Sequence, residues 1–443
     1  MLVLIGLAVA GALGFNSRLR ASSAWKATVT PLSSIMGSGF LVSAPLVASV
    51  TGPWAPLAMG GLLLMAFALG AMIRFNIRYA ESLLAEAGDE EASEEASDEE
   101  ASDEDASALA TLEHRLHAGH ALRTMAHWAA PRTLAARTEQ LSHLVLAAAY
   151  VVSVSYYLQL LSAFVLDRFG LHDPLYNRVA TSGVLVVITV IGGLWGLRAL
   201  EKVETYAVSL NLGTIVALLV GLLLYAGSQV YQGSFALPRA PSEVDPLRSL
   251  RVMMGLLIVV QGFETSRFLG EEHSVEERVR TMRNAQLIAS GIYLTFVTLM
   301  LPLLQGDLQA EVTAVVRLVA PVAAVLPVLI VIAAVGSQFS ASVADDAGCA
   351  GLLGTIFGDR LSPRWSYLGI GLCAIALTWL TDVVSVISLA SRAFALFYAL
   401  QCAVTAITAY TNEGARHRRL YLVGGALCSL LALAVTLFGI PAE

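Results

Sequence analysis

The sequence predicts an all-α integral membrane protein that crosses the lipid bilayer about 12 times. Of its 443 residues, 56% are hydrophobic and only 14% are charged, whereas about 25% of the residues in a typical soluble domain are charged. The charged residues are also unevenly spread, because Leu141–Val165 and Val319–Val335 contain no Asp, Glu, Lys or Arg. Apolar runs of about 18 residues or more are long enough to cross the bilayer.

One weak and eleven strong spans can be delimited along the chain. The weak span, Met1–Phe15, is short and rich in glycine, and no basic residues precede it. We therefore expect a retained helix within residues 1–20 rather than a cleaved signal peptide. A core at residues 24–412 and a last helix at residues 418–443 hold the strong spans: Ala27–Val50, Trp54–Tyr79, Leu141–Phe169, Val179–Leu197, Tyr206–Tyr225, Leu250–Leu269, Ala285–Leu304, Val319–Ala344, Tyr367–Leu380, Val383–Thr411 and Tyr421–Ile440.

The Arg and Lys residues of the loops predict the orientation. If the first helix begins outside the cell, the cytoplasmic segments hold 20 Arg and Lys residues and the opposite segments hold six. Cytoplasmic loops carry an excess of these residues, and one missed span would invert every later loop. The bias supports a multi-pass protein of the cell (inner) membrane, and the Ala- and Arg-rich composition indicates a prokaryotic source.

An acidic low-complexity segment separates the second and third strong spans. Twelve acidic residues lie within Glu86–Asp105, so the net charge of −7 reflects this segment and indicates no nucleic-acid partner. Because it cannot bury a core, segment 86–107 predicts a disordered cytoplasmic loop. Residues 108–130 predict an amphipathic helix on the inner membrane surface. Metal binding by His114 and His117 is the less favoured interpretation of that helix.

Two spans carry glycines where a membrane helix should be continuous. The first strong span contains Gly37–Gly39, and the sixth contains Gly262–Glu264. Unpaired backbone groups at membrane depth are tolerated only where they line a cavity or meet a ligand. For the first span, close helix packing through small residues is the alternative. A carboxylate at mid-bilayer costs about 2.5–3.5 kcal/mol, and the alternative for Glu264 is an i+3 ion pair with Arg267 near the end of its span.

The two breaks lie five spans apart, which indicates two inverted five-helix repeats. Transporters with this architecture place a broken helix at corresponding positions of both halves, with the substrate and ion sites between them. Amide groups at a helix end suit an anionic group, and exposed carbonyl groups suit a cation. The sequence therefore predicts a binding site near the middle of the membrane.

Several motifs resemble those of the amino acid-polyamine-organocation (APC) superfamily. They match its first core helix, the end of its second, its fourth-to-fifth connection and its sixth core helix. The matching stretches are, in chain order, Gly37–Gly39, Arg78–Glu81, Gly196–Arg198 leading into Tyr206, Gly262–Glu264, Glu271-Glu272 and Arg278–Arg283. The resemblance covers about Ala27 to Ile440. It implies the leucine-transporter fold, with a five-plus-five inverted repeat, alternating access and one extra helix at each end.

The chain also resembles sodium/solute symporters, in which one helix precedes the core. Ala333–Ser340 is similar to their Ala-x-x-Ser-Ser sodium motif, although Gln338 stands where a second Ser or Thr is expected. The resemblance implies carbonyl ligands for Na⁺ from Ser33, Met36 and Ala334, a hydroxyl ligand from Ser337 and an amide oxygen from Gln338. Helix packing by the Ser and Gln side chains is the alternative. No other cofactor is expected, and the Asp-Pro-Gly and Met-Pro-His motifs of divalent-metal transporters are absent.

These features predict a secondary active transporter that moves a small organic solute, an amino acid or related amine, by symport with Na⁺ or H⁺. Glu264 is the candidate for proton coupling. Only one of Tyr156 and Tyr157 can face the site, and core packing is the alternative for both. The expected partners are the solute and the lipid bilayer, with no nucleic acid. The predicted substrate-binding residues are Gly37, Ser38, Gly39, Tyr156, Gly262, Phe263 and Glu264.

Other interpretations stay open. A membrane receptor or scaffold could hold a partner through the acidic loop, and a passive channel would show no coupling. No enzyme is expected, because the sequence has no phosphate-binding Gly-Lys loop, no His-Glu-x-x-His and no nucleophile elbow. Arg392 needs a partner within its span, and Asp382 is a candidate. Asp345 and Asp346 form an inner gate with arginines or are solvated.

Overall fold

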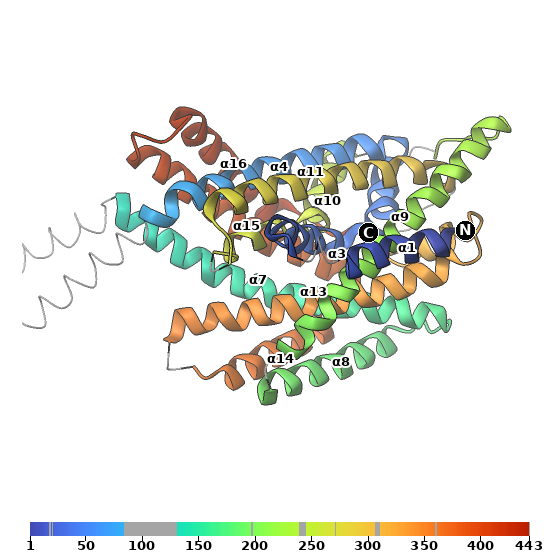
Figure 1. Ribbon diagram of the computed structural model, residues 1–443, viewed down its shortest axis with the longest axis horizontal. Helices are drawn as coiled ribbons and strands as arrows, with labels where there is room; N and C mark the ends of the chain where they lie inside the picture. Colours follow the sequence, from blue (N-terminus) through green and yellow to red (C-terminus); the bar gives the residue numbers. More distant parts are fainter. Residues whose placement is uncertain are drawn as a thin grey trace, which may run out of the picture.

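The computed structural model describes residues 1–443 except 17–18, 20, 84–130, 196–197, 239–244, 271, 306–310, 359–360 and 443. The predicted acidic loop at 86–107 and amphipathic helix at 108–130, with His114 and His117, lie outside the described residues, as do Gly196 and Glu271. Every regular element in the described part is a helix (Figure 1), which confirms the all-α class.

The first half of the chain forms six helices that match the predicted spans. α7 begins well before its predicted start at Leu141, because the polar turns that precede Leu141 also pack inside the protein, with Glu139 only 6% exposed. The elements are α1 (Leu2–Phe15), α3 (Ser23–Thr51), η1 (Gly52–Trp54), α4 (Ala55–Phe75), the π-helical turn η2 (Asn76–Ala80), α7 (Pro131–Arg168), α8 (Pro174–Trp195) and α9 (Arg198–Tyr231).

The second half of the chain also forms helices near the predicted spans, with one exception. The sixth strong span is not one helix but three short pieces, α10 (Pro246–Gly255), η3 (Leu257–Val260) and η4 (Phe263–Phe268). The other elements are α11 (Val275–Met300), η5 (Leu301–Leu303), α12 (Ala314–Leu318), α13 (Leu326–Phe357), α14 (Pro363–Leu380), α15 (Val383–Thr411) and α16 (Arg418–Phe438). Within the described residues, eight helices are long and apolar enough to cross a membrane, and the count of about 12 stays a prediction.

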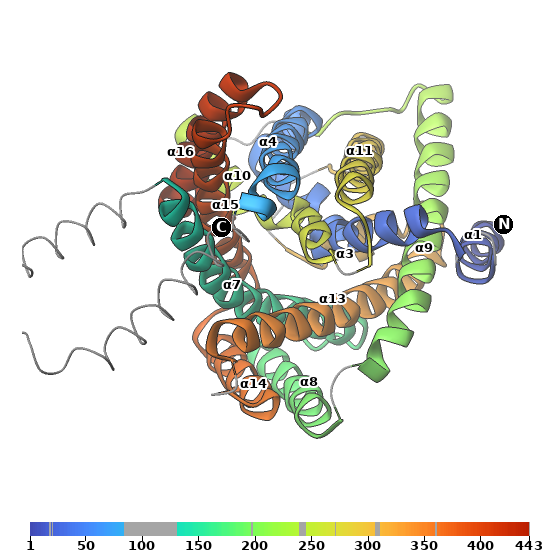
Figure 2. The same cartoon turned by 60° about the vertical axis from the view of Figure 1, so that its left-hand side comes forward.

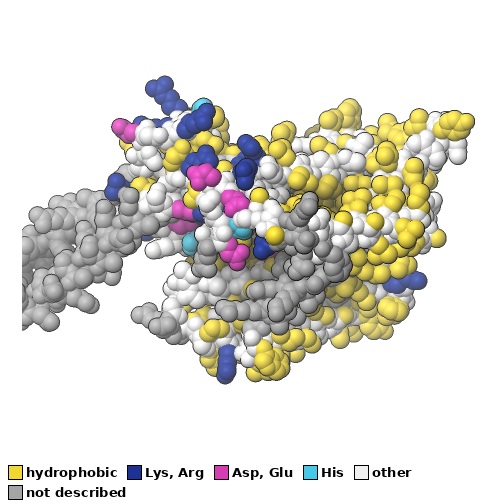
Figure 3. All heavy atoms as spheres, viewed as in Figure 1, with side chains coloured by type: hydrophobic (Ala, Val, Ile, Leu, Met, Phe, Trp, Pro, Cys, Tyr) yellow, Lys and Arg dark blue, Asp and Glu magenta, His cyan; other side chains and the backbone are white. Residues whose placement is uncertain are grey.

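The helices surround a core that contains both broken spans. α3 and the η3–η4 segment lie inside; α4, α11 and α16 cover one side, and α8 and α14 lie on the opposite side beyond α7 and α13 (Figures 1 and 2). Phe40, Val259 and Phe263 are each at most 1% exposed. Charged side chains gather at one end of the molecule, whereas much of the rest of that face is hydrophobic (Figure 3). We call this the arginine-rich end.

Candidate functional site

The first break lies within α3 at Gly39. Its backbone angles, φ 176° and ψ 14°, depart from those of a helix. A φ of 176° is open to any residue, so the requirement for glycine comes from close contact. A Cβ at this position would lie 2.7 Å from Val259 Cγ1 and 2.8 Å from Val259 Cα. Gly39 therefore allows the first break to lie directly against the second.

The second break lies between η3 and η4. Gln261 is extended, and Gly262 has a φ of +113°, a conformation that residues with a Cβ rarely adopt. A Cβ on Gly262 would lie 2.7 Å from the carbonyl carbon of Ser34 and 2.8 Å from the nitrogen of Ile35. Each break thus uses one glycine to approach the backbone of the other break.

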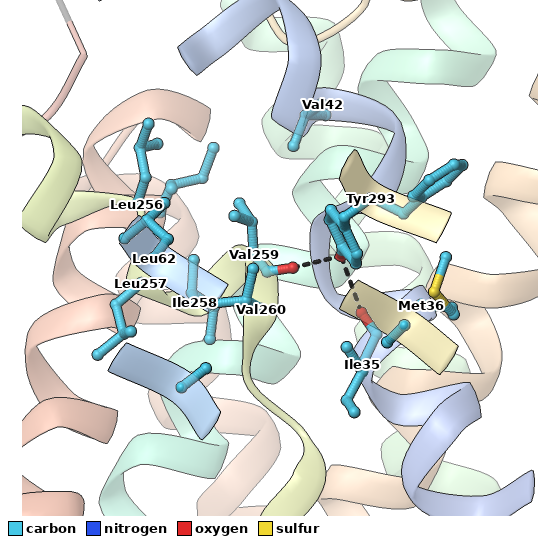
Figure 4. Packing of buried hydrophobic residues seen from close by; sticks show 14 of the residues in the cluster. Ile35, Met36, Val42, Leu62, Leu256, Leu257, Ile258, Val259, Val260 and Tyr293 are labelled. Carbon is cyan, nitrogen blue, oxygen red and sulfur yellow. Dashed lines mark hydrogen bonds between the residues drawn. The ribbon is translucent and has the colours of Figure 1, made fainter. Parts of the chain in front are cut away.

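Tyr293 of α11 joins the two breaks (Figure 4). Its buried hydroxyl donates to the carbonyl oxygen of Ile35 at 3.0 Å and also to that of Val259. Interrupted helices leave carbonyl groups without intrahelical partners, and such groups are costly at membrane depth. A tyrosine hydroxyl has one hydrogen, so the two carbonyl groups share a single donor.

Glu264 is buried at the start of η4. Its side chain is 1% exposed, and its Oε2 accepts hydrogen bonds from the backbone nitrogen of Gly262 at 3.0 Å and from the hydroxyl of Tyr398 at 2.7 Å. Among the described residues, no Lys, Arg or His forms an ion pair with Glu264. The predicted alternative of an ion pair with Arg267 is wrong.

Arg267 instead pairs with a carboxylate from another helix. Its Nη2 lies 2.8 Å from Oε1 of Glu139 on α7, and Oε2 of the same carboxylate accepts a hydrogen bond from Gln401 of α15 at 2.9 Å. The ring of His143 lies 2.9 Å from Oε1 of Glu139, and Asn76 of η2 donates to Gln401 at 3.0 Å. This buried network ties η4 to α7, α15 and η2.

Aromatic side chains surround Glu264. Phe263 stacks on Tyr398, with ring centroids 5.2 Å apart and an interplanar angle of 14°. On α7, Tyr157 accepts a hydrogen bond from Gln261 at 3.0 Å. The structure thus brings Tyr157 to the unwound segment, whereas the predicted site residue Tyr156 is fully buried beside it.

The candidate Na⁺ ligands lie where α3 contacts α13. Ser337 donates to the carbonyl oxygen of Ala334 at 3.2 Å, and Gln338 donates to that of Gly37 at 2.8 Å. Oε1 of Gln338 is buried and accepts no hydrogen bond in the described structure. Met36 is 2% exposed, and Ser33 shares a cavity with Ser337.

That cavity has a volume of about 640 Å³ and lies between α3, η4, α7 and α13. Its polar lining includes Ser33, Ser34, Thr265, Ser337 and Asp345. It extends along the last turns of α13 toward the arginine-rich end. A small organic solute would fit in this volume, because ligand pockets usually measure about 300–1,000 Å³.

Two weaker expectations can be corrected. Asp345 and Asp346 are 6% and 3% exposed, so the alternative that they are solvated is wrong; Ser153 donates a hydrogen bond to Asp345. Arg392 does not pair with Asp382. Its Nε donates to the carbonyl oxygen of Thr436 at 2.7 Å, while Asp382 caps α15.

Several residues of this site gave no signal in the sequence. Tyr293 and Tyr398 are single tyrosines within apolar spans, a pattern shared with many core residues. Glu139 lay outside the predicted span, yet a carboxylate with a histidine four residues later, just before an apolar run, is a detectable feature. Within the described part of the chain, no three His, Cys, Asp or Glu side chains gather in a way that could hold a metal ion.

The chain can now be compared with known proteins. A sequence profile described as "APC superfamily transporter" matches residues 17–110 and 116–439, so the chain belongs to the APC superfamily of transporters. An uncharacterized protein of Aquifex aeolicus (strain VF5) is 36% identical over 423 residues, which cover 95% of this chain and 91% of that protein. The family membership confirms the resemblance drawn from the sequence motifs.

A solved structure with a TM-score of 0.50 supports the fold. A mutant of the Eremococcus coleocola manganese transporter is similar with a TM-score of 0.50 and 12% identity, over 94% of this chain and 87% of that one. The nucleobase-cation-symport-1 family transporter Mhp1, in a closed conformation with bromovinylhydantoin bound, is similar with a TM-score of 0.46 and 11% identity, over 94% and 93% of the two chains. The chain has the leucine-transporter fold, and the protein is a membrane transporter.

Proposed function

We propose that this transporter is a secondary active symporter for a small organic solute, an amino acid or related amine, driven by H⁺ or Na⁺. The observation that carries the proposal is the Glu264 carboxyl group, which is buried at the second break without a cationic partner in the described structure. A lone carboxylate at membrane depth is costly unless it is neutralised. A proton, a metal cation or the ammonium group of a solute would each neutralise it.

The hydrogen bonds of Glu264 favour a positively charged solute group beside it. The amide group at the start of η4 would otherwise attract an anion, but Gly262 already donates to Glu264. A solute carboxylate at this position would meet a like charge. The phenyl ring of Phe263 and the ring of Tyr398, stacked at 5.2 Å, offer apolar and cation–π contacts to an amine.

Sodium coupling is the second form of the proposal. The buried Oε1 of Gln338, which accepts no hydrogen bond in the described structure, is an oxygen of the kind that hard cations bind. Ser33 and Ser337 add hydroxyl oxygens in the same region. The location we propose is the inner membrane of a prokaryotic cell, with the arginine-rich end in the cytoplasm.

The experiment compares Glu264→Gln with wild type in proteoliposomes. Uptake of labelled amino acids and of their decarboxylated amines is measured under three conditions: with an imposed H⁺ gradient, with an imposed Na⁺ gradient, and without any ion gradient. Glutamine keeps the size of the side chain but cannot release a proton. We expect the variant to lose H⁺-driven accumulation and to exchange solute more slowly without a gradient, because the carboxylate that would face the solute ammonium group is gone. Wild-type accumulation in Glu264→Gln would refute the role of this carboxyl group in coupling.

The matched control is Glu413→Gln, which makes the same chemical change at a side chain that is 88% exposed. It should transport like wild type. A thermal-shift screen of the purified protein against the same solutes, with Na⁺ or K⁺, tests the sodium form, because a ligand that binds the folded state raises its stability. Stabilisation that is equal in Na⁺ and K⁺ would exclude Na⁺ as the coupling ion.

A further inference from the structure

A second cavity lies at the arginine-rich end, outside the two broken helices. Its volume is about 510 Å³, and it is formed by α4, η2, α11 and the start of α16, with the three α-helices on the same side of the molecule (Figures 1 and 2). We call it the basic pocket. Its lining contains one carboxylate, Glu276, and the basic residues Arg74, Arg78, Arg280, Arg283, Arg416 and His417.

The positive charge of the basic pocket is not compensated within the described structure. Arg78, Arg280 and Arg283 are exposed and form no ion pair with a described residue. Arg278, which lies on α11 beside them, is by contrast paired with Glu81 at 2.6 Å. The unpaired arginines on this part of α11 therefore belong to the lining of the pocket.

The pocket is held in shape by contacts of its own walls. Arg74 is only 8% exposed; its guanidinium group lies 4.9 Å from the centre of the Phe67 ring and donates to the side chain of Gln286. The ring of Phe75 on α4 stacks on that of Tyr421 on α16, with centroids 4.4 Å apart. A fixed buried arginine thus forms the floor, and exposed arginines surround it.

Exposed apolar side chains lie next to the pocket, further along the same helices. On α11, Leu287 and Ile288 are 53% and 44% exposed, and Leu287 is about 6 Å along the helix from Arg283. On α4 and α16, Leu64 and Leu427 are 73% and 56% exposed. A phosphate ion from water would need no such surface, whereas the acyl chains of a lipid would cover it.

We propose that the basic pocket binds the phosphate headgroup of an anionic phospholipid from the same leaflet, with its acyl chains along α11 and α16. Arginine side chains bind phosphate oxygens through two parallel hydrogen bonds. Basic pockets between membrane helices at the cytoplasmic side are suited to such headgroups. This proposal does not depend on the identity of the transported solute.

The test uses the full-length protein, purified in a neutral detergent and titrated with phosphatidylglycerol while its thermal stability is followed. We expect saturable stabilisation that falls with rising salt concentration. The variant Arg280→Gln/Arg283→Gln should bind about thirtyfold more weakly, since each arginine near the surface contributes about fivefold. The control Arg364→Gln/Arg419→Gln removes equal charge at the same end but outside the pocket, and should weaken binding much less than the pocket variant does.

Four results would overturn the proposal. Equal stabilisation by phosphatidylcholine would mean that headgroup charge is not recognised. Equal stabilisation by glycerol 3-phosphate or inorganic phosphate would mean that the ligand is a soluble phosphate. Equal weakening in both double variants would mean that general surface charge, and not the pocket, attracts the lipid. Binding that appears only after deletion of the acidic segment 86–107 would mean that the pocket is not free for lipid in the native chain. The elution profile and stability of each variant without lipid verify that it is folded.

Discussion

Replacing Gly262 by alanine tests whether the two breaks are locked together as the geometry requires. An L-residue in a left-handed conformation costs about 1–2 kcal/mol, and Gly262 has a φ of +113°. The added Cβ would also lie 2.7 Å from the carbonyl carbon of Ser34, and overpacking of this kind costs about 1–3 kcal/mol. The backbone cannot yield easily, because Tyr293 binds both segments. We therefore expect the free energy of unfolding to fall by about 2–5 kcal/mol.

The measurement is reversible unfolding in mixed micelles of a mild detergent and dodecyl sulfate, followed by circular dichroism. The matched control is Gly291→Ala on α11, where a Cβ would meet nothing within 4 Å. Alanine is the better helix former by about 0.5–1 kcal/mol, so this control should be neutral or slightly stabilising. If Gly262→Ala and Gly291→Ala unfold alike, the requirement for glycine at the second break is refuted.

Three further predictions follow from other contacts of the structure. Arg267→Ala should cost about 3–5 kcal/mol because it removes the arginine that pairs with the buried Glu139 carboxylate; a double-mutant cycle with Glu139→Ala that gives no coupling energy would contradict this. Tyr293→Phe should cost about 0.5–1.5 kcal/mol, since it removes the hydroxyl that donates to two buried carbonyl groups, and an unchanged melting temperature would count against it. Asp382→Ala should cost about 1 kcal/mol through loss of the α15 cap. Burial alone would raise the pKa of Asp382, but hydrogen bonds from Ser385 and the backbone outweigh it and lower the pKa. Because the pKa of Asp382 is lower in the folded state, its charged form stabilises the folded protein at pH values above the unfolded-state pKa of about 3.9. The difference in the free energy of unfolding between wild type and Asp382→Ala should therefore be constant from about pH 5 to 7 and shrink below about pH 4. A constant difference down to about pH 2 would exclude the charge as its source.

Hydropathy was sufficient to locate the long apolar helices of the described residues, because a helix that crosses the hydrocarbon core needs about 20 mostly apolar residues. The two breaks were also visible, since a glycine at membrane depth is a local property of the sequence. The partners of Glu264 were not visible. Tyr398 is 134 residues away along the chain, and only the fold brings α15 beside η4.

The same limit explains the error at Arg267. The helical i+3 relation to Glu264 is local and easily read, but neighbouring positions on a helix do not pair when other helices supply competing partners. At this place the chain forms the short 3₁₀ segment η4, in which side chains three residues apart still share a side, but the Glu264 carboxyl group is bound by Gly262 and Tyr398 instead. Arg267 then meets Glu139 of α7, a residue that the predicted span boundary had placed outside the core.

The position of Glu264 restricts the orientation in which the proposed solute would bind at the two breaks. Its carboxyl group accepts the hydrogen bond from the backbone nitrogen of Gly262, so this nitrogen is not available to bind an anionic group of the solute. Under the proposed function, the ammonium group of an amino acid would face Glu264, and its carboxylate would have to lie toward Gly37–Gly39 of the first break. A decarboxylated amine needs only the first of these two contacts. If the protein takes up the amine but not the amino acid, the second break alone recognises the solute. If uptake requires both the ammonium and the carboxylate group, the two breaks bind one solute together.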